Sequence, residues 1–84
     1  MNSNQQFINL TTKANQGDHS ASQLLHDYYY DEKYSELTYD DAFVNHYKKE
    51  AEENKLYSLY QLSFMYLCGF GVDKNKEMAL ELLK

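Results

Sequence analysis

Apolar residues recur along most of this chain at the three- and four-residue spacing of amphipathic helices. A first helix is predicted over residues 4–15, and Gly17 interrupts the pattern after it. A second helix is predicted over residues 19–31, because Asp18 before it is a favourable N-cap residue. The residues expected on the inner face of this second helix are Ala21, Leu24, Leu25 and Tyr28 or Tyr29.

The middle of the chain predicts a third helix over about residues 39–53. The sequence Thr38-Tyr39-Asp40-Asp41 resembles a capping box, in which the acid three residues after the cap reaches back to the N–H of the cap. The residues expected to point inward are Ala42, Phe43, His46 or Tyr47, and Ala51. The charged residues expected in solvent are Lys48, Lys49, Glu50, Glu52 and Glu53.

Two further helices are predicted in the last third of the chain, the first over about residues 55–67. Its expected inner side contains Leu56, Leu59, Leu62, Ser63 and Tyr66. Gly69 and Gly71 follow it and tolerate the positive φ angles of a tight reversal. Asn75 or Asp73 is expected to cap the last helix, whose apolar face consists of Ala79, Leu80, Leu82 and Leu83.

An internal similarity appears when residues 11–47 are aligned with residues 48–84 at an offset of 37. Identity is close to chance level, but each identical position lies on a predicted inner face. The matched pairs are Ala14/Ala51, Leu25/Leu62, Tyr29/Tyr66 and Ala42/Ala79, with Ala21/Ser58 as a pair of small residues. Small residues at helix crossings allow close backbone approach, and a period of this size is typical of helix-hairpin arrays. Glu32 and Tyr34 stand where Gly69 and Gly71 stand later.

At these positions the chain resembles the Sel-one-like repeat, a relative of the tetratricopeptide repeat. The match is clear over residues 51–84, which include the loop Gly69-Phe70-Gly71-Val72, and weaker over residues 14–50. The resemblance implies an all-α solenoid of antiparallel helix pairs, with about five helices here. The positions that match the family pattern are Ala51, Ser58, Leu62, Tyr66, Gly69, Gly71 and Ala79.

One repeat domain is therefore expected over residues 1–84. Its expected parts are an N-terminal helix at 1–17, a degenerate first repeat at 18–50 and a second repeat at 51–84. The second repeat stops inside its second helix, without a C-cap after Leu83. Because helical arrays normally end in a polar capping helix, we expect this end to be covered by a partner or a second copy, or to continue in a longer array.

Composition narrows the classes of partner. The net charge is −5 and no arginine is present, so nucleic acid and anionic membranes are disfavoured. No apolar run approaches the roughly 20 residues that cross a bilayer. The N-terminus lacks the pattern of a secretory signal, and the single Cys68 fits a reducing compartment. These features predict a cytoplasmic protein.

Nine tyrosines are the most unusual feature of the composition. The run Tyr28–Tyr30 lies on a predicted helix, where neighbouring side chains diverge by about 100° and cannot all face one core. One interpretation is that tyrosines cover helix seams with their hydroxyls in water. The other is a concave surface that grips a peptide or protein, because tyrosine is enriched in binding hot spots. The candidate partner-binding residues are Tyr28, Tyr30, Tyr57 and Tyr60.

No group of residues predicts catalysis, a metal site or a cofactor. His19 and His26 would lie about 10.5 Å apart along a helix, too far to share one zinc ion. Cys68 follows a helix C-terminus, where the helix dipole disfavours a thiolate, so we expect a small buried residue there. Gly69 and Gly71 lack the strand and the lysine of a phosphate-binding loop.

The sequence therefore predicts a non-catalytic module for protein–protein interaction, the adaptor or scaffold role that the resemblance implies. Acidic rims favour a basic partner segment. Two alternatives stay open. One is a small bacterial immunity or regulatory protein that inhibits a single toxin or enzyme. The other is a structural protein that forms homo-oligomers through Leu80, Leu82 and Leu83.

Overall fold

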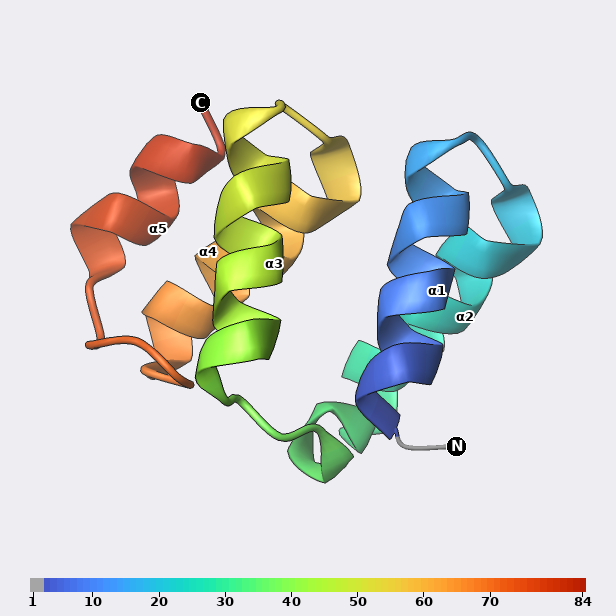
Figure 1. The fold of residues 1–84 in the computed structure, drawn as a ribbon, viewed down its shortest axis with the longest axis horizontal. Coiled ribbons are helices and arrows are strands. Elements are labelled where there is room, and N and C mark those ends of the chain that lie inside the picture. The colour runs from blue at the N-terminus through green and yellow to red at the C-terminus, as the bar shows by residue number, and fades with distance from the viewer. Residues whose placement is uncertain (1–2) are drawn as a thin grey trace. The chain divides into compact units, whose positions relative to one another are not determined.

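The computed structural model describes residues 3–84, which form five α-helices, one 3₁₀ helix and no strand (Figure 1). The predicted all-α class is therefore confirmed. The elements are α1 (Ser3–Asn15), α2 (His19–Tyr30), η1 (Lys33–Glu36), α3 (Asp41–Glu52), α4 (Leu56–Cys68) and α5 (Lys76–Leu82). The chain divides into two compact units, of which the first ends at Thr38 and the second begins at Tyr39. The repeat boundaries expected from the sequence stay a prediction.

The first unit is built on the hairpin of α1 and α2. Its buried apolar residues are Phe7, Ala14, Ala21, Leu25 and Leu37. The ring of Phe7 is fully buried and packs against the ring of Tyr28 in a T-shaped arrangement, with ring centroids 5.1 Å apart. The predicted cap of α2 is confirmed, because the Asp18 carboxylate accepts a 3.0 Å hydrogen bond from Ala21 N. Leu24 was predicted to face inward, but half of its surface is exposed.

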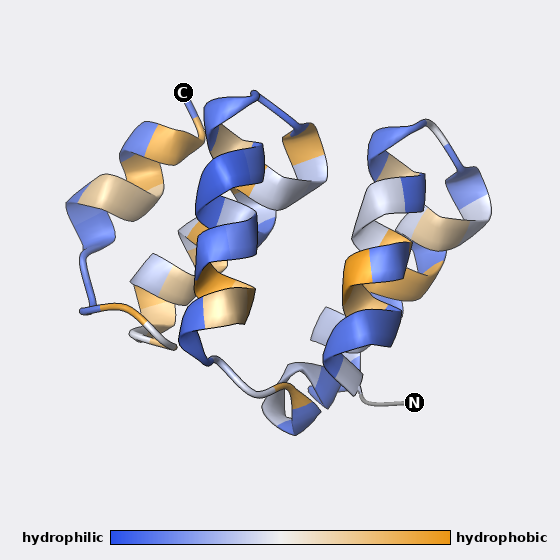
Figure 2. Ribbon diagram, in the orientation of Figure 1, coloured by the Kyte–Doolittle hydropathy of each residue, from blue (hydrophilic) through white to orange (hydrophobic). Residues whose placement is uncertain are grey.

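The second unit contains α3, α4 and α5. Helices α3 and α5 both pack against α4. Its buried apolar residues are Phe43, Val44, Tyr47, Ala51, Leu62, Met65 and Ala79. In Figure 2, α3 is blue along most of its length, whereas much of α5 is cream or orange. Helix α5 thus carries more apolar sequence than its single buried residue, Ala79, accounts for.

The start of α3 corrects two predictions. The helix begins at Asp41 and its N-cap is Asp40, whose carboxylate accepts a 2.9 Å hydrogen bond from Phe43 N. Asp is a stronger cap than Thr, so the cap lies two residues after the predicted Thr38. As the second residue of the helix, Ala42 is exposed, although it was predicted to point inward.

The turn after α1 and the turn after α3 have the same backbone hydrogen bonds at the offset of 37 residues. Gly17 and Asn54 both adopt positive φ, at 95° and 58°. Asn is one of the few non-glycine residues that adopt this conformation readily. The equivalent bonds are Gly17 N to Ala14 O with Asn54 N to Ala51 O, and Asp18 N to Lys13 O with Lys55 N to Glu50 O.

The helices that follow these turns also end in a similar way. Glu32 after α2 has φ 59°, and the aligned Gly69 after α4 has φ 77°. The two segments differ two residues later, because Tyr34 belongs to η1 whereas Gly71 adopts φ 74°. A Cβ atom at Gly71 would lie 2.6 Å from Val44 Cγ2, so only glycine allows the loop to approach α3 this closely.

Candidate protein-binding surface

Helix α4 has no charged residue in its 13 positions and is apolar around most of its circumference. The residues that it buries are Ser58, Gln61, Leu62, Ser63 and Met65. A helix that is apolar on all sides is normally buried on all sides, yet one side of α4 is open to solvent. That side is the first candidate for a binding surface.

We call the residues of this open side the α4 stripe, which comprises Leu56, Tyr60, Phe64 and Leu67. At about 100° per residue, the four positions fall within an arc of about 80°. The exposed fractions are 51% for Leu56, 48% for Tyr60 and 47% for Leu67, and Phe64 is half-buried. Leu56 was predicted to face inward, and its exposure corrects that prediction.

Aromatic contacts extend the stripe at both of its edges. Tyr57 packs edge-on against Tyr60 with ring centroids 5.9 Å apart. Phe64 packs against Phe70 in the following loop at 5.8 Å, and Phe70 contacts Tyr39 at 5.0 Å. The aromatic rings are therefore held in place by neighbouring rings, which lowers the entropy that binding would cost.

Helix α5 carries two further exposed leucines close to the point where it meets α4. The buried Ser63 hydroxyl donates a 2.8 Å hydrogen bond to Ala79 O, which fixes where α4 and α5 meet. Leu67 lies four residues after Ser63, and Leu83 lies four residues after Ala79, so both flank this meeting point. Leu80 and Leu83 are 55% and 51% exposed. Helix α5 thus carries exposed apolar side chains of its own near the point where it meets α4.

Leu82, the third residue predicted to mediate self-association, is not exposed with Leu80 and Leu83. It is half-buried and lines a hollow of about 330 Å³ together with Ala51, Leu62 and Tyr66. Lys48, Glu52 and Met78 complete the lining of this hollow. Lys48 and Met78 also line the adjoining hollow beside Gly69 and Gly71. The repeat positions Ala51, Leu62 and Tyr66 are thus brought together, whereas Leu82 is separated from Leu80 and Leu83.

The four candidate tyrosines lie in different units. Tyr57 and Tyr60 are neighbours on α4, with Tyr57 half-buried. Tyr28 is half-buried against Phe7 in the first unit, whereas Tyr30 is 81% exposed and stacks on His26. Tyr57 and Tyr60 therefore contact each other, whereas Tyr28 and Tyr30 contact different rings in the first unit.

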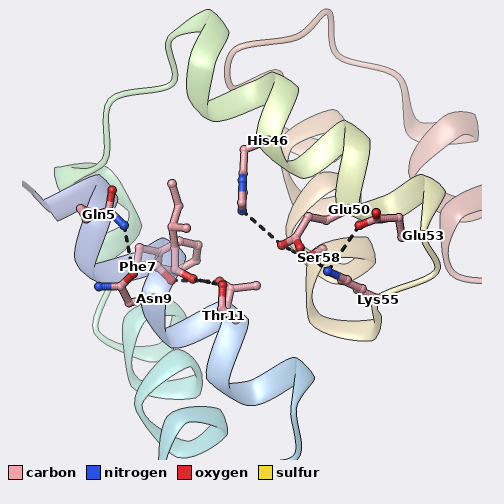
Figure 3. Close-up of polar contacts among 11 residues, drawn as sticks. Gln5, Phe7, Asn9, Thr11, His46, Glu50, Glu53, Lys55 and Ser58 are labelled. Atoms are coloured by element: carbon pink, nitrogen blue, oxygen red, sulfur yellow. Dashed lines mark hydrogen bonds and ion pairs between the residues drawn. The ribbon is translucent and has the colours of Figure 1, made fainter.

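A buried carboxylate was missed by the sequence analysis. Glu50 was predicted in solvent, but it is only 8% exposed and lies between α3 and the start of α4 (Figure 3). The carboxylate oxygen Oε2 accepts a hydrogen bond from Lys55 Nζ at 2.8 Å, and Oε1 accepts one from Ser58 Oγ at 3.1 Å. The buried His46 Nε2 lies 3.1 Å from Glu50 Oε1 as a close polar contact, without the alignment of a hydrogen bond.

The electrostatics of this cluster favour the charged carboxylate. Burial by itself raises the pKa of Glu50, but the hydrogen bonds from Lys55 and Ser58 and the charges of His46 and Lys55 lower it below the ordinary value of 4.5. The hydrogen bonds of Lys55 with Glu50 and Glu53, and the negative charges of these two carboxylates, raise the pKa of Lys55. The cluster joins two helices and has the character of a structural clamp.

Other candidate groups are placed as follows. Cys68 is exposed as the last residue of α4, which corrects its prediction as a buried residue. His19 and His26 lie on the exposed side of α2.

Within residues 3–84, no three His, Cys, Asp or Glu side chains are grouped as a metal ion would require. None of the helices in this part of the chain combines the length and hydropathy that a bilayer crossing requires.

Comparison with models of protein families, with curated proteins and with solved structures gave no match.

Proposed function

We propose that this protein is a non-catalytic module that binds another protein through the α4 stripe and the adjoining leucines of α5. The observation that carries the proposal is the uncharged α4, which leaves Leu56, Tyr60 and Leu67 about half exposed. Contiguous apolar surface of this kind is uncommon on monomers and marks interaction sites. Tyr60 supplies an anchor of the type found in hot spots.

The proposed fold is a Sel-one-like solenoid, and the proposed role is that of an adaptor or scaffold. Support comes from the two hairpin turns with equivalent hydrogen bonds 37 residues apart and from the matching positive φ angles at Glu32 and Gly69. A basic partner segment is favoured at a distance by the net charge of −5. At the stripe itself the partner must be apolar, because α4 offers no counter-charge.

The experiment compares proteins that co-purify from native cells with the wild-type chain and with two matched variants. Leu67→Glu places a charge in the α4 stripe, whereas Leu24→Glu places the same charge on α2 at a leucine of similar exposure. Partners that are lost only with Leu67→Glu support the proposal. The same set of proteins with all three chains would overturn it. Circular dichroism of each variant checks that it is folded.

Self-association is the second candidate function, and the exposure of Leu80 and Leu83 on α5 favours it. The variant Leu83→Glu is expected to lower the oligomer mass in light scattering. Leu82→Glu is the comparison, because Leu82 faces a different hollow and should act mainly on stability.

A further inference from the structure

The α4 stripe has a pattern that complements itself. Read from either end it runs aliphatic, aromatic, aromatic, aliphatic: Leu56, Tyr60, Phe64, Leu67. Two such helices placed antiparallel would bring Leu56 of one copy opposite Leu67 of the other, and Tyr60 opposite Phe64. A two-fold interface requires this kind of reciprocity, in which residue i meets residue j and residue j meets residue i.

The charge distribution fits the same arrangement. A two-fold axis brings identical side chains near each other, so any charge close to the axis meets its own copy. Helix α4 avoids this repulsion because none of its 13 residues is charged. The stripe from Leu56 to Leu67 is about 16 Å long, which corresponds to three turns of a partner helix.

We infer that the α4 stripe pairs with the α4 stripe of a second copy of this chain, in antiparallel orientation about a two-fold axis. This inference rests on the proposed use of the stripe for protein binding and names its occupant. Leu80 and Leu83 on the neighbouring helix α5 are also about half exposed and would add to the apolar area that the second copy covers.

The first test is sedimentation equilibrium of the full chain over a concentration series. The wild-type mass should rise toward twice 10.0 kDa, and added salt should tighten the dimer, because salt screens the net charge of −5 on each copy. Leu56→Lys and Leu67→Glu should each weaken the dimer at least about tenfold, since each buries a charge opposite a leucine. Leu24→Glu should leave it unchanged.

Mixing the two weakened variants tests the antiparallel register. In a mixed dimer, the lysine introduced at position 56 faces the glutamate introduced at position 67, while the other end keeps its pair of leucines. The mixture should therefore dimerise at least about tenfold more tightly than either variant alone. If a charged variant loses its helical signal, Leu67→Ala replaces it, because alanine favours helix and still removes the contact.

Three results would overturn the inference. A folded wild-type chain that stays at 10.0 kDa at every concentration excludes the second copy, although the α4 stripe would still be free for a different protein. A dimer that survives both stripe variants uses another surface. A mixture that stays as weak as its components excludes the antiparallel pairing.

Discussion

The side-chain amide of Asn4 makes two reciprocal 2.8 Å hydrogen bonds with the backbone of Thr38. Asn4 Nδ2 donates to Thr38 O, and Thr38 N donates to Asn4 Oδ1. The first turn of α1 is thereby tied to the last residue of the first unit. An amide side chain can replace a backbone strand here because it carries one donor group and one acceptor in the same plane.

Replacing Asn4 should loosen this end of the first unit. Asn4→Ala removes both hydrogen bonds and is expected to lower the free energy of unfolding by about 1–2 kcal/mol. Asn4→Asp keeps the acceptor and loses the donor, so a smaller loss is expected. Urea unfolding monitored by circular dichroism measures both. Equal unfolding free energies for the wild type, Asn4→Ala and Asn4→Asp would show that the two hydrogen bonds do not contribute to stability.

Gly71 should be the least replaceable glycine. Alanine there combines φ 74° with a Cβ atom 2.6 Å from Val44 Cγ2 and 3.0 Å from Tyr39 O. The expected loss of stability is about 2–4 kcal/mol. Gly17→Ala is the matched control, because its φ is 95° but no atom lies within 4 Å, and about 1–2 kcal/mol is expected. A larger loss at Gly17 would contradict the close approach of the loop to α3.

Ser63 should contribute more than a surface serine. Its hydroxyl donates a hydrogen bond to Ala79 O in the last turn of α5, where backbone carbonyls lack partners within the helix. Ser63→Ala leaves that buried carbonyl unpaired, at an expected cost of about 1–3 kcal/mol. Ser35→Ala removes a comparable but exposed bond to Glu32 O and should cost much less. Thermal unfolding of the two variants gives the comparison.

The Glu50 cluster should make stability depend on pH in the acid range. The pKa of Glu50 is below 4.5 in the folded chain, so the unfolded chain binds the proton first as the pH falls. The contribution of Glu50 is therefore complete above about pH 4.5 and is lost as the pH falls through the lower folded pKa. Unfolding free energies measured between neutral and acid pH should show this decline.

A substitution separates Glu50 from the other carboxylates. Glu50→Gln should make the acid part of the stability profile flatter and should lower stability at neutral pH. Glu77→Gln, at an exposed position on α5, should leave the profile close to that of the wild type. If the stability–pH profile of Glu50→Gln runs parallel to that of the wild type, Glu50 is not the source of the pH dependence.

The sequence predicted those parts of the fold that local signals determine. Asp18 was predicted as a cap, and Asn75 as one of two candidates with Asp73; Asp18 and Asn75 both accept the expected backbone hydrogen bonds. Gly69 and Gly71 adopt the positive φ angles that a glycine loop indicates. Each of these features depends on residues within a few positions of one another, so tertiary contacts did not have to be known.

The wrong burial predictions concern residues whose exposure depends on a contact across a turn or on the position of a helix within the fold. Glu50 sits in a charged run, and its partners Lys55 and Ser58 lie beyond the turn, outside the spacing of helical ion pairs. Helix α4 has no charged residue and carries apolar residues on most of its circumference, so periodicity could not show that Leu56 lies on the open side. Cys68 is exposed because the helix ends there, and the helix end was placed one residue too early.

The most direct test of a binding role for the α4 stripe is photo-cross-linking in native cells. A photoreactive phenylalanine analogue replaces Tyr60 in one chain and Leu24 in a control chain, and adducts are separated by mass. We expect a discrete protein adduct from position 60 only, at twice 10.0 kDa if the occupant is a second copy. If position 60 gives no adduct beyond those from position 24, the α4 stripe is not a protein-binding surface.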